Sequence, residues 1–165
     1  MSIAHTVRMY LEGRGVPYEV IAHKRSATSL RAAETAHIEA ERLAKAVLFE
    51  DDLEHDRYVV AVLPATQRVR VPELAIAVGR PVHVASEEEA SALFGDCEPG
   101  AIPALGPAYG VETVIEDSVL EHPDLYFEAG DHEHLVHLKT RDFAALLADC
   151  RHGRFGESPE NRASG

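Results

Sequence analysis

The chain contains 165 residues, of which 45% are hydrophobic and 27% charged, as is typical of a globular domain that buries its own core. It lacks the run of about 18 apolar residues that a membrane helix needs, and its N-terminus has neither the basic start nor the apolar run of a secretory signal. The net charge of −12 also argues against a general DNA- or RNA-coating protein, because polyanions bind cationic surfaces; we therefore expect a cytoplasmic protein without membrane or DNA partners.

The charge is unevenly distributed along the chain. Residues 1–80 carry 11 Lys and Arg against 11 Asp and Glu, whereas residues 81–165 carry 5 against 17. A polyanion is thus expected to approach the N-terminal half, although the asymmetry could equally serve only solubility. The two cysteines, Cys97 and Cys150, are too few for a disulfide framework and do not have the spacing of a metal site, so we expect reduced thiols.

Hydrophobic periodicity predicts helices and strands that alternate along the chain. In the first half we expect a helix over 3–13, a strand over 16–23, a helical stretch capped by Ser29 and running to about Leu43, and strands over 44–51 and 57–65 joined by an acidic turn. A short helix then follows Pro72, a strand covers 82–86, and a helix with a Ser86–Glu89 capping box covers 86–95. The last elements are strands over 112–117, 124–130 and 134–140 and a helix over 141–150 capped by Thr140. This order predicts an α/β or α+β domain over residues 1–152, with a mixed sheet flanked by helices. Residues 153–165 lack apolar periodicity and are expected to form a mobile tail.

Two features are candidates for chemistry. Lys45 stands between alanines in an apolar strand, where its ammonium could bind a phosphate or carboxylate, or could simply reach solvent at a strand edge. The stretch C-E-P-G-A-I-P-A-L-G, residues 97–106, is rich in Gly and Pro and apolar. Gly100 permits close approach to the main chain, and the prolines fix the backbone, so its amides are suited to stabilise negative charge on a carbonyl oxygen. An ordinary tight connection would show the same composition.

The histidines of A-G-D-H-E-H-L-V-H-L allow a metal hypothesis. On a strand, His132 and His134 share one face and His137 lies on the other, which makes at most an incomplete zinc site. A single histidine in a substrate pocket is the more plausible interpretation. The sequence contains no nucleophile elbow, no phosphate-binding glycine motif and no standard cofactor motif, so no cofactor is expected.

Taken together, these segments resemble the YbaK-type aminoacyl-tRNA deacylase family, which is related to the editing insertion of bacterial prolyl-tRNA synthetases. The resemblance extends from about residue 5 to residue 150. It is carried by the order and spacing of several short motifs: G-V-P-Y-E-V, L-A-K-A-V-L-F, V-V-A-V-L-P, L-A-I-A-V-G-R, E-P-G-A-I-P-A-L-G, E-T-V-I-E-D-S, E-A-G-D-H-E-H-L-V-H-L and R-D-F-A-A-L-L.

The resemblance implies a single domain with a curved, barrel-like mixed sheet and a site that hydrolyses the ester between a wrong, small amino acid and tRNA. By position, Lys45 matches the lysine that holds the terminal adenosine or phosphate region, and Gly100 matches the glycine whose backbone faces the ester. The substrate-binding positions that it implies are His23, Ser29, Ala101, Ile102, Pro103, His134 and Asp142. Many relatives carry a proline at the position of Ala104, and some carry a tyrosine at the position of His23.

The expected function is therefore trans-editing of tRNA mischarged with Ala, Ser or Cys, by water attack that the substrate's ribose hydroxyl assists. An aminoacyl ester is already activated, so positioning and an oxyanion-binding loop could supply most of the rate without a strong nucleophile. An aminoacyl-tRNA synthetase is a possible partner. The alternative is a non-catalytic module that binds aminoacyl-tRNA or a synthetase, and a zinc hydrolase using His132 and His134 is a third interpretation.

Overall fold

A computed structural model describes residues 3–159 of the chain. Its helices are α1 (His5–Gly13), α2 (Ser29–Ala36), α3 (Val71–Val78), α4 (Glu87–Leu93) and α5 (Thr140–Leu146), with the short 3₁₀ helices η1 (Ala40–Arg42), η2 (Gly106–Tyr109) and η3 (Asp117–Glu121). No helix within this range combines the length and apolar character needed to cross a bilayer.

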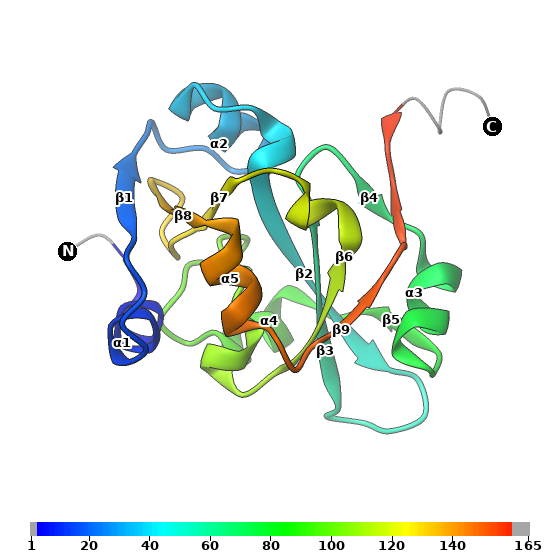
Figure 1. The fold of residues 1–165 in the computed structure, drawn as a ribbon. Coiled ribbons are helices and arrows are strands. Elements are labelled where there is room, and N and C mark those ends of the chain that lie inside the picture. The colour runs from blue at the N-terminus through cyan, green and yellow to red at the C-terminus, as the bar shows by residue number, and fades with distance from the viewer. Residues whose placement is uncertain (1–2, 160–165) are drawn as a thin grey trace.

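The strands are β1 (Glu19–Ala22), β2 (Leu43–Asp51), β3 (Tyr58–Pro64), β4 (Arg68–Val69), β5 (Val82–Val84), β6 (Glu112–Glu116), β7 (Asp124–Glu128), β8 (His134–Lys139), β9 (Arg151–Gly153) and β10 (Gly156–Glu157). Within the described residues, eight of them form one mixed sheet in the order β1-β8-β7-β2-β3-β6-β9, with β5 paired to β2. The sheet is curved and open rather than a closed barrel, and β2 and β3 cross its centre (Figure 1). The mixed α+β class and the single curved sheet flanked by helices, which the sequence predicts, are confirmed.

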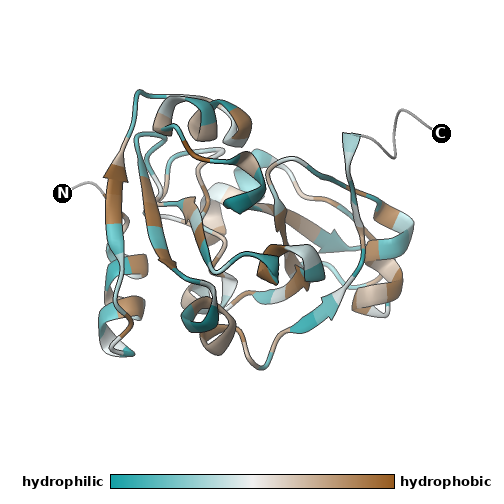
Figure 2. Cartoon of the chain, turned by 45° about the horizontal axis from the view of Figure 1, so that its top comes forward, coloured by the Kyte–Doolittle hydropathy of each residue, from teal (hydrophilic) through white to brown (hydrophobic). Residues whose placement is uncertain are grey.

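The two faces of the sheet carry separate apolar clusters. Alternation along β2 places Ala44 and Leu48 in the larger cluster, which α1 and α5 cover, whereas Leu43 and Phe49 point to the other face. On that second face α3 packs near Phe49, and α2 packs near Leu43. Figure 2 shows brown and teal stretches alternating along the strands. Lys45 lies between Leu43 and Phe49 along the strand and therefore belongs to the second face.

One edge of β2 is incompletely paired, and this positions the candidate site. Over residues 44–50, β2 pairs antiparallel with β3. On its other edge, β7 pairs only with Leu43 and Ala44, and β5 pairs only with residues 49–51. A gap thus remains beside residues 45–47. The loop that follows α4 lies at this gap, since Gly100 and Ile102 line the same pocket as residues 46–48.

Three predictions about helix ends are wrong. The helical stretch after residue 28 ends at Ala36 rather than near Leu43, because His37 adopts a left-handed conformation (φ 58°) and its amide closes the last turn. Thr28, and not Ser29, caps α2, since its side chain accepts from the amide of Arg31. In α5, Lys139 occupies the cap position, and the buried Thr140 Oγ1 has no hydrogen-bond partner among the described residues.

The prediction of a mobile tail from residue 153 is wrong for the residues that follow directly. β9 pairs in parallel with β6, and β10 pairs with β4. Between them, Phe155 is fully buried in the cluster on the α3 side of the sheet. Burial of one aromatic ring therefore fixes a segment that has no apolar repeat. Residues 160–165 lie outside the described residues.

Candidate functional site

A pocket of about 190 Å³ opens at the gap in the β2 edge. Its walls come from β2, from β5 and the start of α4, and from the glycine-containing loop. It is lined by Ala46, Val47, Leu48, Val84, Ala85, Ser86, Glu87, Ala90, Gly100 and Ile102. Three consecutive β2 residues line it, so the pocket lies at the strand edge, and Ala46, Leu48 and Ile102 belong to the larger apolar cluster. Its mainly apolar lining suits a small side chain.

The glycine loop begins with a tight turn. The Ala101 amide donates to the Glu98 carbonyl at 3.1 Å, and Gly100 has a φ of 81°. Pro at the second position and Gly with positive φ at the third are the signature of a type II turn, so the E-P-G-A sequence accounts for this local structure. Ala101 and Pro103 are buried behind the turn, and Gly100 itself is exposed. The turn thus presents main chain, rather than side chain, to solvent.

The exposed amides of this loop are available to a ligand. Within the described residues, neither Gly100 N–H nor Ile102 N–H donates to a backbone carbonyl. The loop is held from behind, because the Glu98 amide donates to the Gly130 carbonyl at 2.7 Å and Ala104 and Leu105 are buried in the larger apolar cluster. A fixed loop with uncommitted amides has the properties of an oxyanion-binding element.

His132 packs directly against the turn. Its Nε2 donates to the Pro99 carbonyl at 2.6 Å, and a Cβ at Gly100 would lie 3.3 Å from its Cε1. A carbonyl can only accept, so Nε2 carries a proton and the neutral ring presents Nδ1 as an acceptor. Nδ1 is buried and has no partner among the described residues. His132 also has a φ of 64°, a conformation that the sequence gives no sign of.

Lys45 is half-buried on β2, opposite Leu63 of β3. It precedes Ala46 and shares a face with Val47, and both of these residues line the pocket. The structure therefore brings the lysine strand and the Gly100 loop to the same edge of the sheet. The role that the resemblance implies for Lys45 stays a prediction.

Arg25 joins three segments around the site. Its guanidinium donates to both carboxylate oxygens of Glu98, at 2.6 and 3.3 Å, and to the Asp131 carbonyl at 3.2 Å. The bond from Arg25 lowers the pKa of Glu98. The segment that follows β1 is thereby fastened to the glycine loop and to the loop between β7 and β8. Sequence reasoning missed this contact, because the partners are more than 70 residues apart.

The segment that follows β1 carries two of the predicted positions. The His23 amide donates to the Glu133 carbonyl, and its Nδ1 lies 2.7 Å from the Lys24 carbonyl, while its Nε2 is buried without a partner among the described residues. Ser29 is half-buried at the first turn of α2 and is not part of the pocket lining. The neighbouring Ser26 is the buried one: its amide donates to the His132 carbonyl, and its hydroxyl has no partner within residues 3–159.

Two predicted substrate-binding residues have other neighbours. His134 Nδ1 lies 2.7 Å from Asp131 Oδ2, so this histidine closes the turn between β7 and β8. Asp142, in the first turn of α5, lines a different hollow together with Tyr18 and Arg141. Neither residue lines the pocket at Gly100. Of the two histidines that the sequence left open, His132 is the one that contacts the glycine loop.

Cys97 directly precedes the loop but is poorly suited to be a nucleophile. Burial raises the pKa of its thiol to about 12, so it stays protonated near neutral pH. Among residues 3–159, no group of three or more His, Cys, Asp or Glu side chains is arranged to hold a metal ion. His132 and His134 are directed to different partners, the Pro99 carbonyl and Asp131.

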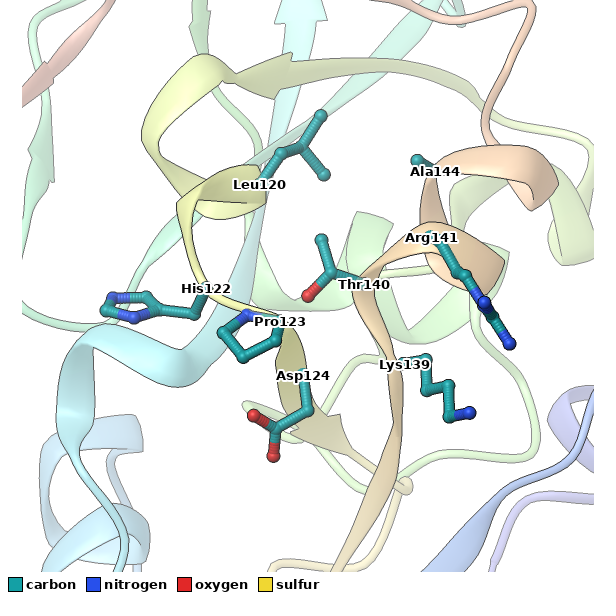
Figure 3. Close-up of a pocket in the computed structure, with 8 residues that line it drawn as sticks. All are labelled: Leu120, His122, Pro123, Asp124, Lys139, Thr140, Arg141 and Ala144. Atoms are coloured by element: carbon teal, nitrogen blue, oxygen red, sulfur yellow. The ribbon is translucent and has the colours of Figure 1, made fainter.

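A larger hollow lies elsewhere on the molecule. It has a volume of about 780 Å³ and is formed by the end of η3, the start of β7 and the start of α5 (Figure 3). Its wall is mostly apolar, with Lys139 and Arg141 on one side. One buried polar atom without a partner among the described residues, Thr140 Oγ1, belongs to its lining. Neither β2 nor the glycine loop contributes to this lining, which is why we place the candidate site at the smaller pocket.

Comparison with known families shows the family to which this fold belongs. The model of the aminoacyl-tRNA editing domain matches residues 23–146. The chain belongs to this family. The matched segment contains Lys45, the glycine loop, His132 and the first turns of α5, so the resemblance inferred from the sequence motifs is confirmed. No curated protein matches the chain.

Solved structures support the fold of this editing domain. A hypothetical protein of 18% sequence identity superposes with a TM-score of 0.81 over 93% of this chain and 100% of its own. A protein proposed as a trans-editing enzyme for prolyl-tRNA synthetase is 20% identical, with a TM-score of 0.78 over 93% of this chain and 96% of its own. A proposed signal transduction protein from Marinobacter aquaeolei VT8 is 21% identical, with a TM-score of 0.74 over 94% of this chain and 31% of its own.

Proposed function

We propose that this editing domain is a trans-acting deacylase that hydrolyses the ester of tRNA mischarged with a small amino acid such as Ala, Ser or Cys. The observation that supports it most is the convergence of uncommitted loop amides and the lysine strand at one pocket. Membership of the editing family and the fold shared with a proposed trans-editing enzyme for prolyl-tRNA synthetase point in the same direction. Because of this likeness, mischarged tRNA for proline is the first substrate to test.

The reaction that we propose needs positioning more than a protein nucleophile. A water molecule attacks the ester carbonyl carbon, and the Gly100 and Ile102 amides stabilise the developing oxyanion. The carbon–oxygen bond to the ribose then breaks, and the ribose oxygen takes a proton. The vicinal ribose hydroxyl orients the water. The products are the free amino acid and uncharged tRNA. Lys45 holds the terminal adenosine or its phosphate in this scheme.

Pocket size supports a small amino acid. About 190 Å³ is below the usual range of about 300–1,000 Å³ for ligand sites, so the pocket suits one short side chain. Ile102 and Leu48 make its wall apolar. A missing or extra methylene changes binding by only about 1–3 kcal/mol, so we expect graded preference among Ala, Ser and Cys and steric rejection of bulky residues.

A panel of mischarged tRNAs tests this function. Each of the Ala-, Ser- and Cys-charged tRNAs, including tRNA for proline, is incubated with the purified protein, and ester loss is followed over time. We expect rapid loss for one or more pairs carrying a small residue and none for correctly charged prolyl-tRNA. If no pair loses its ester at high protein concentration, the proposed function is wrong.

The alternative is a binding module that sequesters aminoacyl-tRNA or docks on a synthetase. The carboxylates of Glu98, Asp131 and Glu133 beside the site favour it, because they weaken independent capture of a polyanion. Such a module would protect the ester in proportion to its own amount. A deacylase removes many esters per protein molecule.

A further inference from the structure

Glu128 is a buried carboxyl group next to the candidate site that the scheme above does not use. It is the last residue of β7 and is only 4% exposed. Its Oε2 has no hydrogen-bond partner within the described residues. A buried, unsatisfied carboxylate oxygen is costly, so a role outside the packing of the core is expected for it.

The sheet register brings Glu128 beside the lysine of the site. The parallel pairing of β2 with β7 joins Leu43 to Tyr126 and Ala44 to Phe127. Lys45 and Glu128 are the next residue on each strand, and alternation places both on the same face. They stand where the pairing ends and the gap in the β2 edge begins.

Two further buried polar groups belong to the segments that meet at the glycine loop. Ser26 and His132 are 9% and 7% exposed, and each has a buried polar atom, Oγ and Nδ1, without a partner within residues 3–159. Their segments meet through the hydrogen bond from the Ser26 amide to the His132 carbonyl. Ala46, Leu48 and Ile102 of the pocket are apolar and belong to the larger cluster, on the face of the sheet opposite to Glu128. The gap in the β2 edge thus has apolar side chains on one face of the sheet and the Glu128 carboxyl group on the other.

This division matches the two groups on the α-carbon of an aminoacyl ester, which are an apolar or small side chain and an ammonium with three N–H donors. We propose that Glu128 binds the free α-ammonium of the aminoacyl group while the apolar pocket takes its side chain. The proposal rests on the proposed function and specifies which chemical feature of the substrate the site recognises. It separates aminoacyl-tRNA from esters that lack the amino group.

Electrostatics is consistent with this assignment. Burial, and secondarily the nearby Asp131 carboxylate, raise the pKa of Glu128 to about 7. The charged groups near it are Lys45, by the strand register, and Asp131. A bound ammonium would stabilise the ionised carboxylate, and the carboxylate would in turn keep the amino group protonated.

A pair of isosteric esters tests the proposal. Deamination with nitrous acid converts alanyl-tRNA to lactyl-tRNA, which replaces the ammonium by a hydroxyl and changes little else. The same conversion is applied to whichever aminoacyl-tRNA is hydrolysed fastest. Each enzymatic rate is divided by the spontaneous hydrolysis rate of the same ester. We expect the wild-type protein to favour the aminoacyl ester by at least about 30-fold, as loss of one partner of a buried charge pair implies.

The Glu128→Gln variant should lose this preference by slowing hydrolysis of the aminoacyl ester while leaving that of the hydroxyacyl ester within about threefold. Glu133→Gln, an exposed carboxylate of the same loop, is the matched control and should keep the full preference. A wild-type protein without preference, or a Glu128→Gln variant that slows both esters equally, would overturn the proposal. The wild-type comparison stands even if the variant does not fold.

Failure of the proposed function can be told apart from failure of this inference. If the wild-type protein hydrolyses neither ester, deacylation is wrong, and binding becomes the measurement. Non-hydrolysable 3′-amide analogues of alanyl- and lactyl-adenosine are then titrated by calorimetry. We expect the alanyl analogue to bind at least about 30-fold more tightly, with the difference lost in Glu128→Gln. Equal affinities would refute the role of Glu128.

Discussion

The imidazole of His132 lies against the main chain of Gly100, so closely that a Cβ at position 100 would be 3.3 Å from Cε1. The same ring holds the preceding residue through the bond from Nε2 to the Pro99 carbonyl. Position 100 therefore favours glycine for two reasons, which are its positive φ and its close contact with His132. This pair of residues sets the position of the loop amides on which the proposed chemistry depends.

We predict that Gly100→Ala lowers deacylation by about 100-fold, because a small displacement of the amides disrupts their alignment with the ester. Gly110→Ala is the matched control: Gly110 also has positive φ, 70°, but open space around its missing Cβ. Both variants should lose about 1–2 kcal/mol of stability from backbone strain. Single-turnover rates and chemical denaturation separate the two effects. Equal activity of the two variants would show that the contact with His132 is irrelevant.

Lys45→Met should reduce deacylation by about 100-fold or more, since it removes the cation that is proposed to hold the substrate's terminal nucleotide. Methionine keeps the length of the side chain in the half-buried strand position. Lys139→Met, in β8, serves as the control for lost charge and should retain most activity, because Lys139 lines two other hollows and not the pocket at Gly100. Circular dichroism checks that both variants are folded. An active Lys45→Met protein would remove the lysine from the mechanism.

The stability of the protein should depend on pH through Glu128. Its pKa is about 7 in the folded protein, raised from 4.5, so between these values the unfolded chain binds fewer protons than the folded protein. Stability therefore falls as pH rises through this window, by at most about 3 kcal/mol. Replacement of Glu128 by Gln removes this loss of stability at high pH. We expect denaturation to show Glu128→Gln gaining stability relative to wild type at pH 8 compared with pH 4.

The exposed Glu121→Gln change is the control for that experiment and should alter stability by no more than about 0.5 kcal/mol at either pH. A Glu128→Gln protein that is relatively less stable at pH 8 than at pH 4 would mean that the carboxylate is compensated in the folded state, against the assignment made above.

Phe155→Ala should destabilise the protein by about 3–5 kcal/mol, because the ring is fully buried between β9 and β10. Ile76→Ala provides the control: Ile76 is on α3, which covers the same cluster, but is 80% exposed. Its replacement should cost no more than about 0.5 kcal/mol. Chemical denaturation measures both. If Phe155→Ala has little effect, the C-terminal strands are not part of the cooperative fold.

Local patterns in the sequence account for much of the fold. Alternating apolar residues and an acidic turn identify the hairpin of β2 and β3, and the Ser86–Glu89 capping box marks the start of α4 as the structure has it. The parallel pairings of β3 with β6 and of β2 with β7 are not encoded locally, because each depends on residues more than 50 positions apart. β9 has no alternation of its own and is fixed by its neighbours and by Phe155.

The site was only partly predictable for the same reason. The E-P-G-A turn and Lys45 are visible in the sequence, since turn chemistry and an isolated cation in an apolar strand are local signals. The choice of His132 over His134 depends on a left-handed backbone at residue 132, and the Arg25–Glu98 contact depends on the tertiary fold. The sequence offers only a weak indication of a role for Glu128, which is a charged residue at the end of an apolar strand.

Multiple-turnover hydrolysis tests the central claim most directly. Tritium-labelled alanyl-tRNA for proline, and its seryl and cysteinyl counterparts, are supplied in about 100-fold molar excess over the protein, and acid-precipitable label is counted over time. We predict that wild-type protein releases many equivalents of at least one amino acid, whereas Lys45→Met releases no more than the buffer control. Release that stops at one equivalent, or protection of the ester, would contradict an editing deacylase and identify a binding module instead.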